Sequence, residues 1–292
     1  MDAMLAAFQN PIFFITFISL IGLVIGSFLN VVIHRLPIML EKSWRHDCEE
    51  FLGLNPSSTS TEPKFNLIYP NSQCPHCHHQ IRFYENIPVI SYLLLGGKCS
   101  NCKSPISSRY PIIEILTALI SVIVAWRLGP TWQTVFGLVL SWALICLAVI
   151  DIDRQLLPDV IVLPLIWLGL LISLFDIFAN SRSSIIGSIA GYMSLWLVFQ
   201  TFKIITGKVG MGHGDFKLLA LFGAWLGWQQ LLLIVLLSSL VGTIAGLLMI
   251  ALQKQDRSVP IPFGPYLGLA GWIAMLWGQE ITSSYLRFAG IQ

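Results

Sequence analysis

The chain has 292 residues, of which 55% are hydrophobic and only 11% are charged. Soluble domains carry about 25% charged residues, and the apolar residues here come in runs of roughly twenty instead of alternating or one-sided patterns. These features exclude a soluble enzyme, a disordered chain and a coiled coil. The 17 basic residues nearly balance the 15 acidic ones, so no basic surplus indicates nucleic acid as a partner.

Eight apolar runs predict an all-α polytopic protein that crosses the lipid bilayer with about eight transmembrane helices. In chain order the runs cover 12–33, 112–126, 132–150, 160–178, 185–205, 216–228, 231–252 and 262–277. The sixth run is short, and a re-entrant sixth element would leave seven spans and move the C-terminus to the other side. No positive residue precedes the first run and no cleavage site follows it, which predicts a retained span and not a signal peptide.

The positions of Lys and Arg predict the orientation of these spans. With the N-terminus outside, fourteen of the seventeen basic residues lie in cytoplasmic segments, and only Arg127, Arg182 and Arg287 lie outside. We therefore expect eight spans with the N-terminus on the outer side.

A charged stretch between the first two runs predicts a small cytoplasmic module. Residues 34–110 hold eight basic residues, six acidic residues and five of the six cysteines. The expected organisation is a first transmembrane helix over 1–33, a cytoplasmic loop domain over 34–110 and a membrane-embedded core of about seven helices over 111–292. Within the loop domain, the polar Pro/Ser/Thr-rich segment 55–64 is predicted to be a flexible excursion.

Two pairs of cysteines in this loop predict a zinc site. Cys74 and Cys77 form one C-x2-C pair, Cys99 and Cys102 form another, and 21 residues separate the pairs. This spacing is typical of four-thiolate zinc sites, which also supply folding energy to short loop domains. Disulfides are the alternative, but a cytoplasmic location disfavours them. Histidines beside the first pair are alternative ligands.

Two aspartates at the ends of apolar runs are the main candidates for chemistry, because ionisable residues in or beside spans are costly. Asp151 ends the third run, and Asp215 follows Gly212 and Gly214 at the start of the sixth. The glycines permit a positive φ and a close approach by another segment. Two carboxylates in opposed environments, one after an apolar run and one at a helix N-terminus, are typical of acid/base catalysis.

Two further aspartates leave alternatives open. Asp153 competes with Asp151, but the two side chains point about 200° apart on a helix, so one of them faces Asp215. We prefer Asp151 because it lies nearer the apolar run. Asp159 is expected to cap the fourth span or to position a substrate. The simplest interpretation, that acidic residues mark helix ends, explains single aspartates better than a glycine-rich run that ends in Asp215.

Several stretches together resemble one known family. Gly212-His-Gly214-Asp215 is similar to the Gly-x-Gly-Asp signature of membrane aspartyl proteases. The two C-x2-C pairs and the stretches GSFLNVVIHRLP, ENIPVISYLLL, SRYPIIE, DIDRQLLPD and PIPFGPYLGLAGW resemble the bacterial type IV prepilin leader peptidase/N-methyltransferase family. The interval of 64 positions between Asp151 and Asp215 agrees with the catalytic pair of that family.

This resemblance implies two activities at the cytoplasmic face of the bacterial inner membrane. The substrates are prepilins and pseudopilins, which carry a short basic leader before a hydrophobic N-terminal helix. The enzyme cleaves the leader after Gly and then methylates the new N-terminal residue, usually Phe, with S-adenosylmethionine. Asp151 and Asp215 correspond to the catalytic residues, Gly212 and Gly214 support the peptidase loop, and 111–292 corresponds to the peptidase core.

The methyl-donor site is indicated only by resemblance, at Gly97 and Lys98 before the second cysteine pair. No Rossmann-type fingerprint for S-adenosylmethionine occurs. Related enzymes often have a basic residue where this chain has Gly96, and the alternative is that Gly96 and Gly97 form only the turn into the cysteine pair.

Two other classes of function stay open at this point. A polytopic cation transporter would use Asp151, Asp153, Asp215 and His213 as an intramembrane metal site. A non-enzymatic assembly scaffold would not need two aspartates on one face. The transporter does not explain the cysteine module or the glycine-rich turn. No pattern indicates an oligomeric state.

Overall fold

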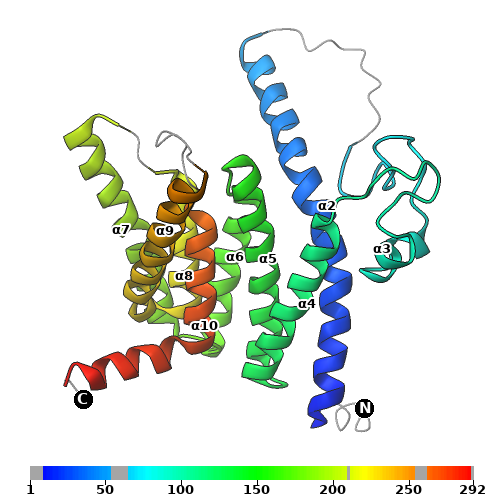
Figure 1. Ribbon diagram of the computed structural model, residues 1–292. Coiled ribbons are helices and arrows are strands. Elements are labelled where there is room, and N and C mark those ends of the chain that lie inside the picture. Colours follow the sequence, from blue (N-terminus) through cyan, green and yellow to red (C-terminus); the bar gives the residue numbers. More distant parts are fainter. Residues whose placement is uncertain (1–8, 54–64, 209–210, 254–261, 291–292) are drawn as a thin grey trace. The chain divides into compact units, whose positions relative to one another are not determined.

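The computed structural model describes residues 9–53, 65–208, 211–253 and 262–290, and these residues are helical with irregular connections (Figure 1). Two isolated β-bridges occur among them, but no β-sheet. The all-α fold class is therefore confirmed. The predicted excursion at 55–64 lies outside the described residues. The chain divides into two compact units, Met1–Pro130 and Thr131–Gln292.

The first unit is built on a close pair of helices, α2 (Pro11–Phe51) and α4 (Arg109–Leu128). The segment of chain that connects α2 to α4 contains the short η1 (Phe83–Asn86) and α3 (Ile90–Leu94). A Cβ at Gly22 would lie 2.8 Å from the Cα of Ala118, and one at Gly26 would lie 2.7 Å from the Cα of Glu114. Glycines four residues apart thus bring the two backbones together, as small residues do between helices in membranes.

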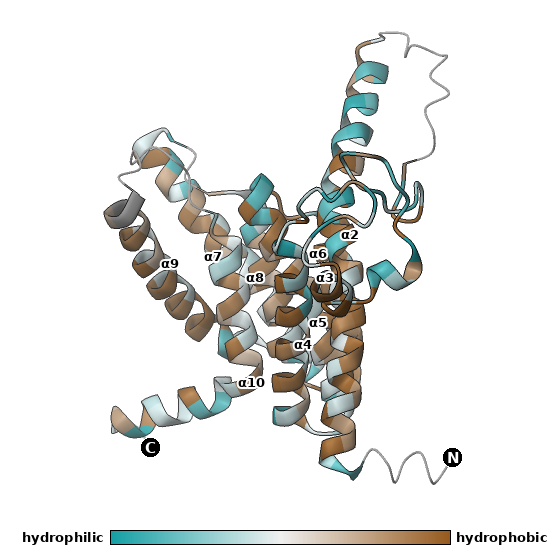
Figure 2. Cartoon of the chain, turned by 45° about the vertical axis from the view of Figure 1, so that its right-hand side comes forward, coloured by the Kyte–Doolittle hydropathy of each residue, from teal (hydrophilic) through white to brown (hydrophobic). Residues whose placement is uncertain are grey.

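Helix α2 is much longer than the apolar run that begins it. The run was expected to end at Ile33, yet the helix continues to Phe51. Its 41 residues rise about 60 Å, twice the roughly 30 Å hydrocarbon thickness of a bilayer. The C-terminal part is hydrophilic (Figure 2) and rich in helix-forming Glu, Lys and Arg, so the helix extends well beyond the apolar layer.

The second unit is a bundle of six α-helices with two short 3₁₀ segments. Its elements are α5 (Trp132–Arg154), α6 (Asp159–Ile172), η2 (Ser173–Phe175), α7 (Ser181–Thr206), α8 (His213–Leu226), η3 (Trp228–Gln230), α9 (Leu231–Gln253) and α10 (Gly264–Phe288). The buried residues of α10 end at Gly278, and its C-terminal part projects away from the other helices of this unit (Figure 1).

Helix α8 is the core of this bundle. Every residue from Asp215 to Leu226 except Lys217 is buried, and α6, α7 and α10 pack around the helix. Glycines bring α7 and α8 together, because a Cβ at Gly187 of α7 would lie 2.5 Å from the carbonyl oxygen of Gly223, and one at Gly191 would lie 2.7 Å from that of Leu219. Near the C-terminal end of α8, Trp225 donates its indole N–H to the carbonyl of Leu165 in α6, at 2.8 Å.

Each of the eight predicted apolar runs lies mainly in a helix, but the helix lengths differ. Five helical segments among the described residues are long and apolar enough to cross a membrane: Pro11–Phe51, Arg109–Leu128, Trp132–Arg154, Ser181–Thr206 and Trp228–Met249. Helix α8 has 14 residues and rises about 21 Å, short of a full crossing. The chain is therefore a multi-pass membrane protein in which α8 is enclosed by other helices.

Candidate active site and metal centre

Asp151 lies in the last turn of α5, where the helix leaves the bundle core. Its side chain is buried and 6% exposed. The backbone N–H of Gly264, the first residue of α10, donates to its Oδ2 at 3.1 Å. A Cβ at Gly264 would lie 2.5 Å from the same oxygen, so only glycine lets the start of α10 come this close.

Asp215 lies in the first turn of α8 and is 7% exposed. Its backbone N–H donates to the carbonyl of Gly212 at 3.3 Å. Gly212 caps the helix with a φ of −79°, and Gly214 is helical, so the positive φ expected for these glycines does not occur. Gly214 instead allows a close approach, because a Cβ there would lie 2.8 Å from the Cβ of Leu157.

The two carboxyl groups belong to one site. They are close enough for a Coulomb interaction between them. Leu157, in the turn after α5, is buried and contacts both neighbouring glycines: its Cδ1 would lie 3.1 Å from a Cβ at Gly214 and 3.3 Å from one at Gly264. Three elements far apart in the sequence thus meet at the pair. Two buried, interacting carboxyl groups favour sharing one proton, which is the arrangement of an acid/base pair.

The other polar residues near the pair have different environments. Asp153 is exposed, two residues beyond Asp151 on the opposite face of α5. Asp159 is the first residue of α6, and its carboxylate accepts two hydrogen bonds from Lys217 Nζ, both at 2.7 Å. The His213 ring packs against Phe199, with 5.2 Å between ring centroids. Among the described residues these groups form no metal-binding cluster with the aspartates, so the cation transporter is not supported.

The four cysteines of the loop form a compact tetrad in the first unit. Their sulfur atoms all lie within 4.8 Å of one another. Cys74 and Cys102 sulfurs are 3.7 Å apart, and those of Cys77 and Cys99 are 3.9 Å apart. A tetrahedral zinc ion with Zn–S bonds of about 2.3 Å requires S···S distances of about 3.8 Å. The thiols are free and not disulfide-bonded, and the tetrad fits a single tetrahedral metal ion.

The two cysteine pairs adopt the same backbone fold, 25 positions apart. In each, the residue after the second cysteine has a left-handed φ: 57° at His78 and 60° at Lys103. Each of these residues donates its N–H to the carbonyl of the first cysteine, Cys74 or Cys99. Two β-bridges, Gln73 with Gln80 and Lys98 with Pro105, close the two turns. The two cysteine pairs therefore form a pair of matching knuckles.

Hydrogen bonds at two of the four cysteines, Cys74 and Cys102, favour the thiolate form that binds a metal. The side chain and backbone of Ser104 lower the pKa of the Cys102 thiol to about 6, and the Cys102 and Ser104 side chains are 3.2 Å apart. Backbone N–H groups of Cys77 and His76 lower the pKa of the Cys74 thiol. Outside the tetrad, the Arg82 backbone N–H, which donates to Glu85 at 2.9 Å, lowers the pKa of that carboxyl.

The residues indicated for the methyl donor lie in the turn that joins α3 to the second knuckle. Gly96 and Gly97 have φ values of 60° and 68°. Gly97 donates its N–H to the carbonyl of Tyr92 at 2.9 Å, and a Cβ at Gly97 would lie 3.0 Å from the Tyr92 hydroxyl oxygen. The turn thus needs both glycines, and it leaves the neighbouring Lys98 exposed beside an aromatic ring.

Two buried charged residues, absent from the sequence-based candidates, anchor the loop to the helices of the first unit. The Arg35 guanidinium on α2 donates to the carbonyls of Asn66 at 3.0 Å and Pro70 at 2.7 Å. On α4, Glu114 is 7% exposed and accepts the N–H of Val89 at 2.8 Å, where Val89 has a φ of 60°. Both residues lie in stretches that carry the family resemblance, GSFLNVVIHRLP and SRYPIIE, but no pattern paired either residue with its partner.

Comparisons with known proteins agree with this architecture. Residues 20–128 match the bacterial peptidase A24 N-terminal domain, and residues 138–247 match the type IV leader peptidase family. No solved structure matches the chain.

Three relatives named prepilin leader peptidase/N-methyltransferase illustrate the similarity. The protein from Pseudomonas aeruginosa is 55% identical over 97% of both chains. The one from Aeromonas hydrophila is 53% identical over 94% of this chain and 95% of its own. The one from Legionella pneumophila is 42% identical over 95% of this chain and 96% of its own. At this identity and coverage, the chain belongs to the prepilin leader peptidase/N-methyltransferase family.

Proposed function

We propose that this chain removes the basic leader of type IV prepilins and pseudopilins with Asp151 and Asp215, and then methylates the new N-terminus. Family membership supports both activities. The observation that carries the peptidase assignment is the buried carboxyl pair, which the N–H of Gly264 and the side chain of Leu157 hold in one place.

In the proposed reaction, one carboxylate removes a proton from a water molecule, whose oxygen attacks the carbonyl carbon of the leader's terminal Gly. The other, protonated carboxyl donates its proton to the carbonyl oxygen as the tetrahedral intermediate forms. When the C–N bond breaks, the proton taken from water passes to the departing amine, and one hydroxyl of the intermediate returns its proton to the second carboxylate. The Gly264 N–H keeps Asp151 Oδ2 fixed, which leaves its other oxygen to face the reactants.

Zn²⁺ is the metal we propose for the tetrad of Cys74, Cys77, Cys99 and Cys102, because its preferred ligands and distances match. Four thiolates leave no position for a substrate, so the ion has a structural role. It would hold the two knuckles together, since each close sulfur pair joins one knuckle to the other.

For the second activity, S-adenosylmethionine supplies a methyl group on a sulfonium, which the free amine attacks. We propose that the turn at Gly97 and Lys98 helps to bind this donor. The exposed Lys98, the adjacent Tyr92 ring and the close backbone approach at Gly97 support this assignment, which the family resemblance first indicated.

We place the N-terminus on the periplasmic side of the bacterial inner membrane and the carboxyl pair at the cytoplasmic face. The distribution of Lys and Arg supports this orientation. Asp151 lies at the C-terminal end of α5 and Asp215 at the N-terminal end of α8. In this topology both ends lie on the cytoplasmic side, where a basic leader remains. The hydrophobic helix that follows the leader would lie in the bilayer beside the enzyme.

The proposal is tested by incubating the purified full chain with a prepilin and labelled S-adenosylmethionine. Asp151→Asn and Asp215→Asn are each expected to lose at least about 1,000-fold in cleavage rate, because neither carboxyl acts alone in an acid/base pair. Asp153→Asn is the matched control and keeps most of the activity, since its side chain is exposed. Normal processing by either of the first two variants would refute the assignment.

A further inference from the structure

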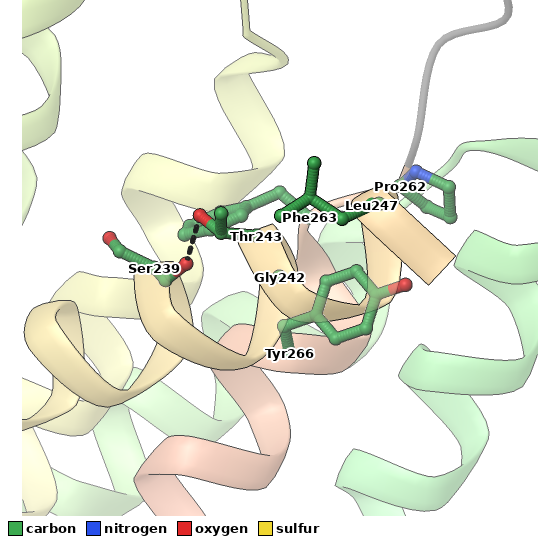
Figure 3. A pocket seen from close by; sticks show the side chains of 8 residues that line it. Ser239, Gly242, Thr243, Leu247, Pro262, Phe263 and Tyr266 are labelled. Carbon is green, nitrogen blue, oxygen red and sulfur yellow. Dashed lines mark hydrogen bonds between the residues drawn. The ribbon is translucent and has the colours of Figure 1, made fainter. Parts of the chain in front are cut away.

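A groove lies between α9 and the start of α10 (Figure 3). Its volume of about 450 Å³ is within the usual range of binding sites, about 300–1,000 Å³. One wall is formed by small residues of α9, and the other by the residues that lead into α10. The residues that matter most are Ser239, Gly242, Thr243, Pro262, Phe263 and Tyr266.

The lining is suited to apolar and aromatic side chains. The Tyr266 ring lies against α9 at Gly242 (Figure 3), where an added Cβ would be 3.4 Å from the ring. The Thr243 hydroxyl donates to the carbonyl of Ser239 at 2.7 Å, so its hydrogen-bonding capacity is used within the helix. Phe263 and Tyr266 then offer ring faces and edges to an occupant, which favours another aromatic ring. A basic peptide would lose hydration here without gaining a charged partner.

The groove is continuous with the proposed catalytic centre. Phe263 lines the groove, and the next residue, Gly264, donates its backbone N–H to Asp151. One residue of extended peptide spans about 3.5 Å, so a chain cleaved at the carboxyl pair reaches the groove within its next few residues. Of the two sides of a prepilin cleavage site, only the one after the cut is apolar.

We propose that this groove binds the apolar side chains that follow the cleaved bond of a prepilin, with the new N-terminal aromatic residue against the rings of Phe263 and Tyr266. The inference rests on the proposed function, because it takes its orientation from the carboxyl pair. In this arrangement, α9 and the residues that lead into α10 select the residue that follows the cleaved bond.

The test compares two prepilins that differ only in having Phe or Ala after the cleaved bond. Gly242→Leu fills the groove, so kcat/KM for the Phe substrate should fall by about tenfold or more through a higher KM, because the contacts removed are binding contacts. The Ala substrate, which leaves the space empty, should lose less than about threefold. Gly242→Ala adds a methyl group at ordinary contact distance from Tyr266. It should also lower kcat/KM more for the Phe substrate than for the Ala substrate, but by a smaller factor.

Leu240→Phe is the matched control, since it adds bulk on an exposed position of α9 that does not line the groove; it should change neither substrate's kinetics. Equal losses for both substrates, or none, in the two Gly242 variants would overturn the proposal. Asp215→Asn, assayed beside them, separates the two hypotheses. If Asp215→Asn is inactive while Gly242→Leu affects the Phe and Ala substrates equally, only the groove assignment fails. Normal cleavage by Asp215→Asn refutes the proposed catalytic pair.

Discussion

Asp151 depends on a backbone donor from a distant part of the chain, and this contact leaves no room for a side chain. Gly264 lies 113 positions after Asp151, and its N–H reaches Oδ2 at 3.1 Å. A methyl group on Gly264 would meet the same oxygen at 2.5 Å, so the carboxyl group or the start of α10 would have to move.

Gly264→Ala is therefore expected to reduce the rate of leader cleavage by about 100-fold, because a displacement of about 1 Å at a catalytic group has that effect. The measurement is kcat on a synthetic prepilin, with thermal unfolding to show that the variant is folded. Gly268→Ala is the control on the same helix, since its added Cβ would lie 3.9 Å from the nearest atom of Leu144. Equal activity of the two variants would show that the close contact at Gly264 is unimportant.

The residue types at this site could be predicted from the sequence, but their surroundings could not. Charged residues are scarce in the apolar runs, which is why Asp151 and Asp215 were conspicuous. Gly264 gave no such signal, because its role is a backbone contact set by tertiary packing. The same holds for Leu157, an ordinary apolar residue that fills the space between two glycines.

At the scale of elements, the two knuckles form one site. Each close sulfur pair takes one cysteine from each knuckle, so neither knuckle has a complete ligand set. Binding of one metal ion should therefore order both knuckles together.

Cys102→Ser is expected to lower zinc affinity by at least about 100-fold, because a three-thiolate site lacks the fourth anionic ligand. Zinc content of the purified protein, measured by atomic emission before and after dialysis against a chelator, should fall from one ion per chain towards none. Cys48→Ser, an exposed cysteine on α2, should retain the full metal content. Loss of zinc from the Cys48 variant alone, or from neither variant, would contradict the assignment of the four cysteines as zinc ligands.

Helix positions were predictable from hydropathy, whereas helix ends were not. Apolar runs located all the membrane helices, but α2 continues for eighteen residues past the expected end because the following polar residues also favour helix. The short sixth run predicted that α8 is shorter than a span, but no periodicity in one sequence reveals that α6, α7 and α10 enclose it. The cysteine spacing revealed the two pairs, but the shared left-handed φ at His78 and Lys103 has no common side chain and could not be predicted.

At the scale of the whole molecule, the proposed activities belong to different compact units. The cysteine tetrad with the Gly97 turn lies in the first unit, and the carboxyl pair with its groove lies in the second. The first reaction produces the amine that the second consumes. Variants of the two units should therefore fail in different ways.

Lys98→Ala is expected to cleave prepilin at a near-normal rate and to incorporate about tenfold less methyl label, because an exposed charge that contacts the donor is lost. Asp215→Asn should release no mature pilin and incorporate no label from a prepilin. Given a synthetic pilin with a free N-terminal Phe, Asp215→Asn should methylate it normally and Lys98→Ala should not. Failure of Asp215→Asn on the free amine would show that the two activities share residues.

The order of the segments around Asp151 has a consequence for biogenesis. A ribosome produces Asp151 first, Asp215 next and Gly264 last. A nascent chain that has emerged as far as α9 holds both aspartates but lacks the N–H donor and one wall of the groove. If the proposed catalytic pair is correct, full proteolytic activity therefore requires that the last helix has been inserted.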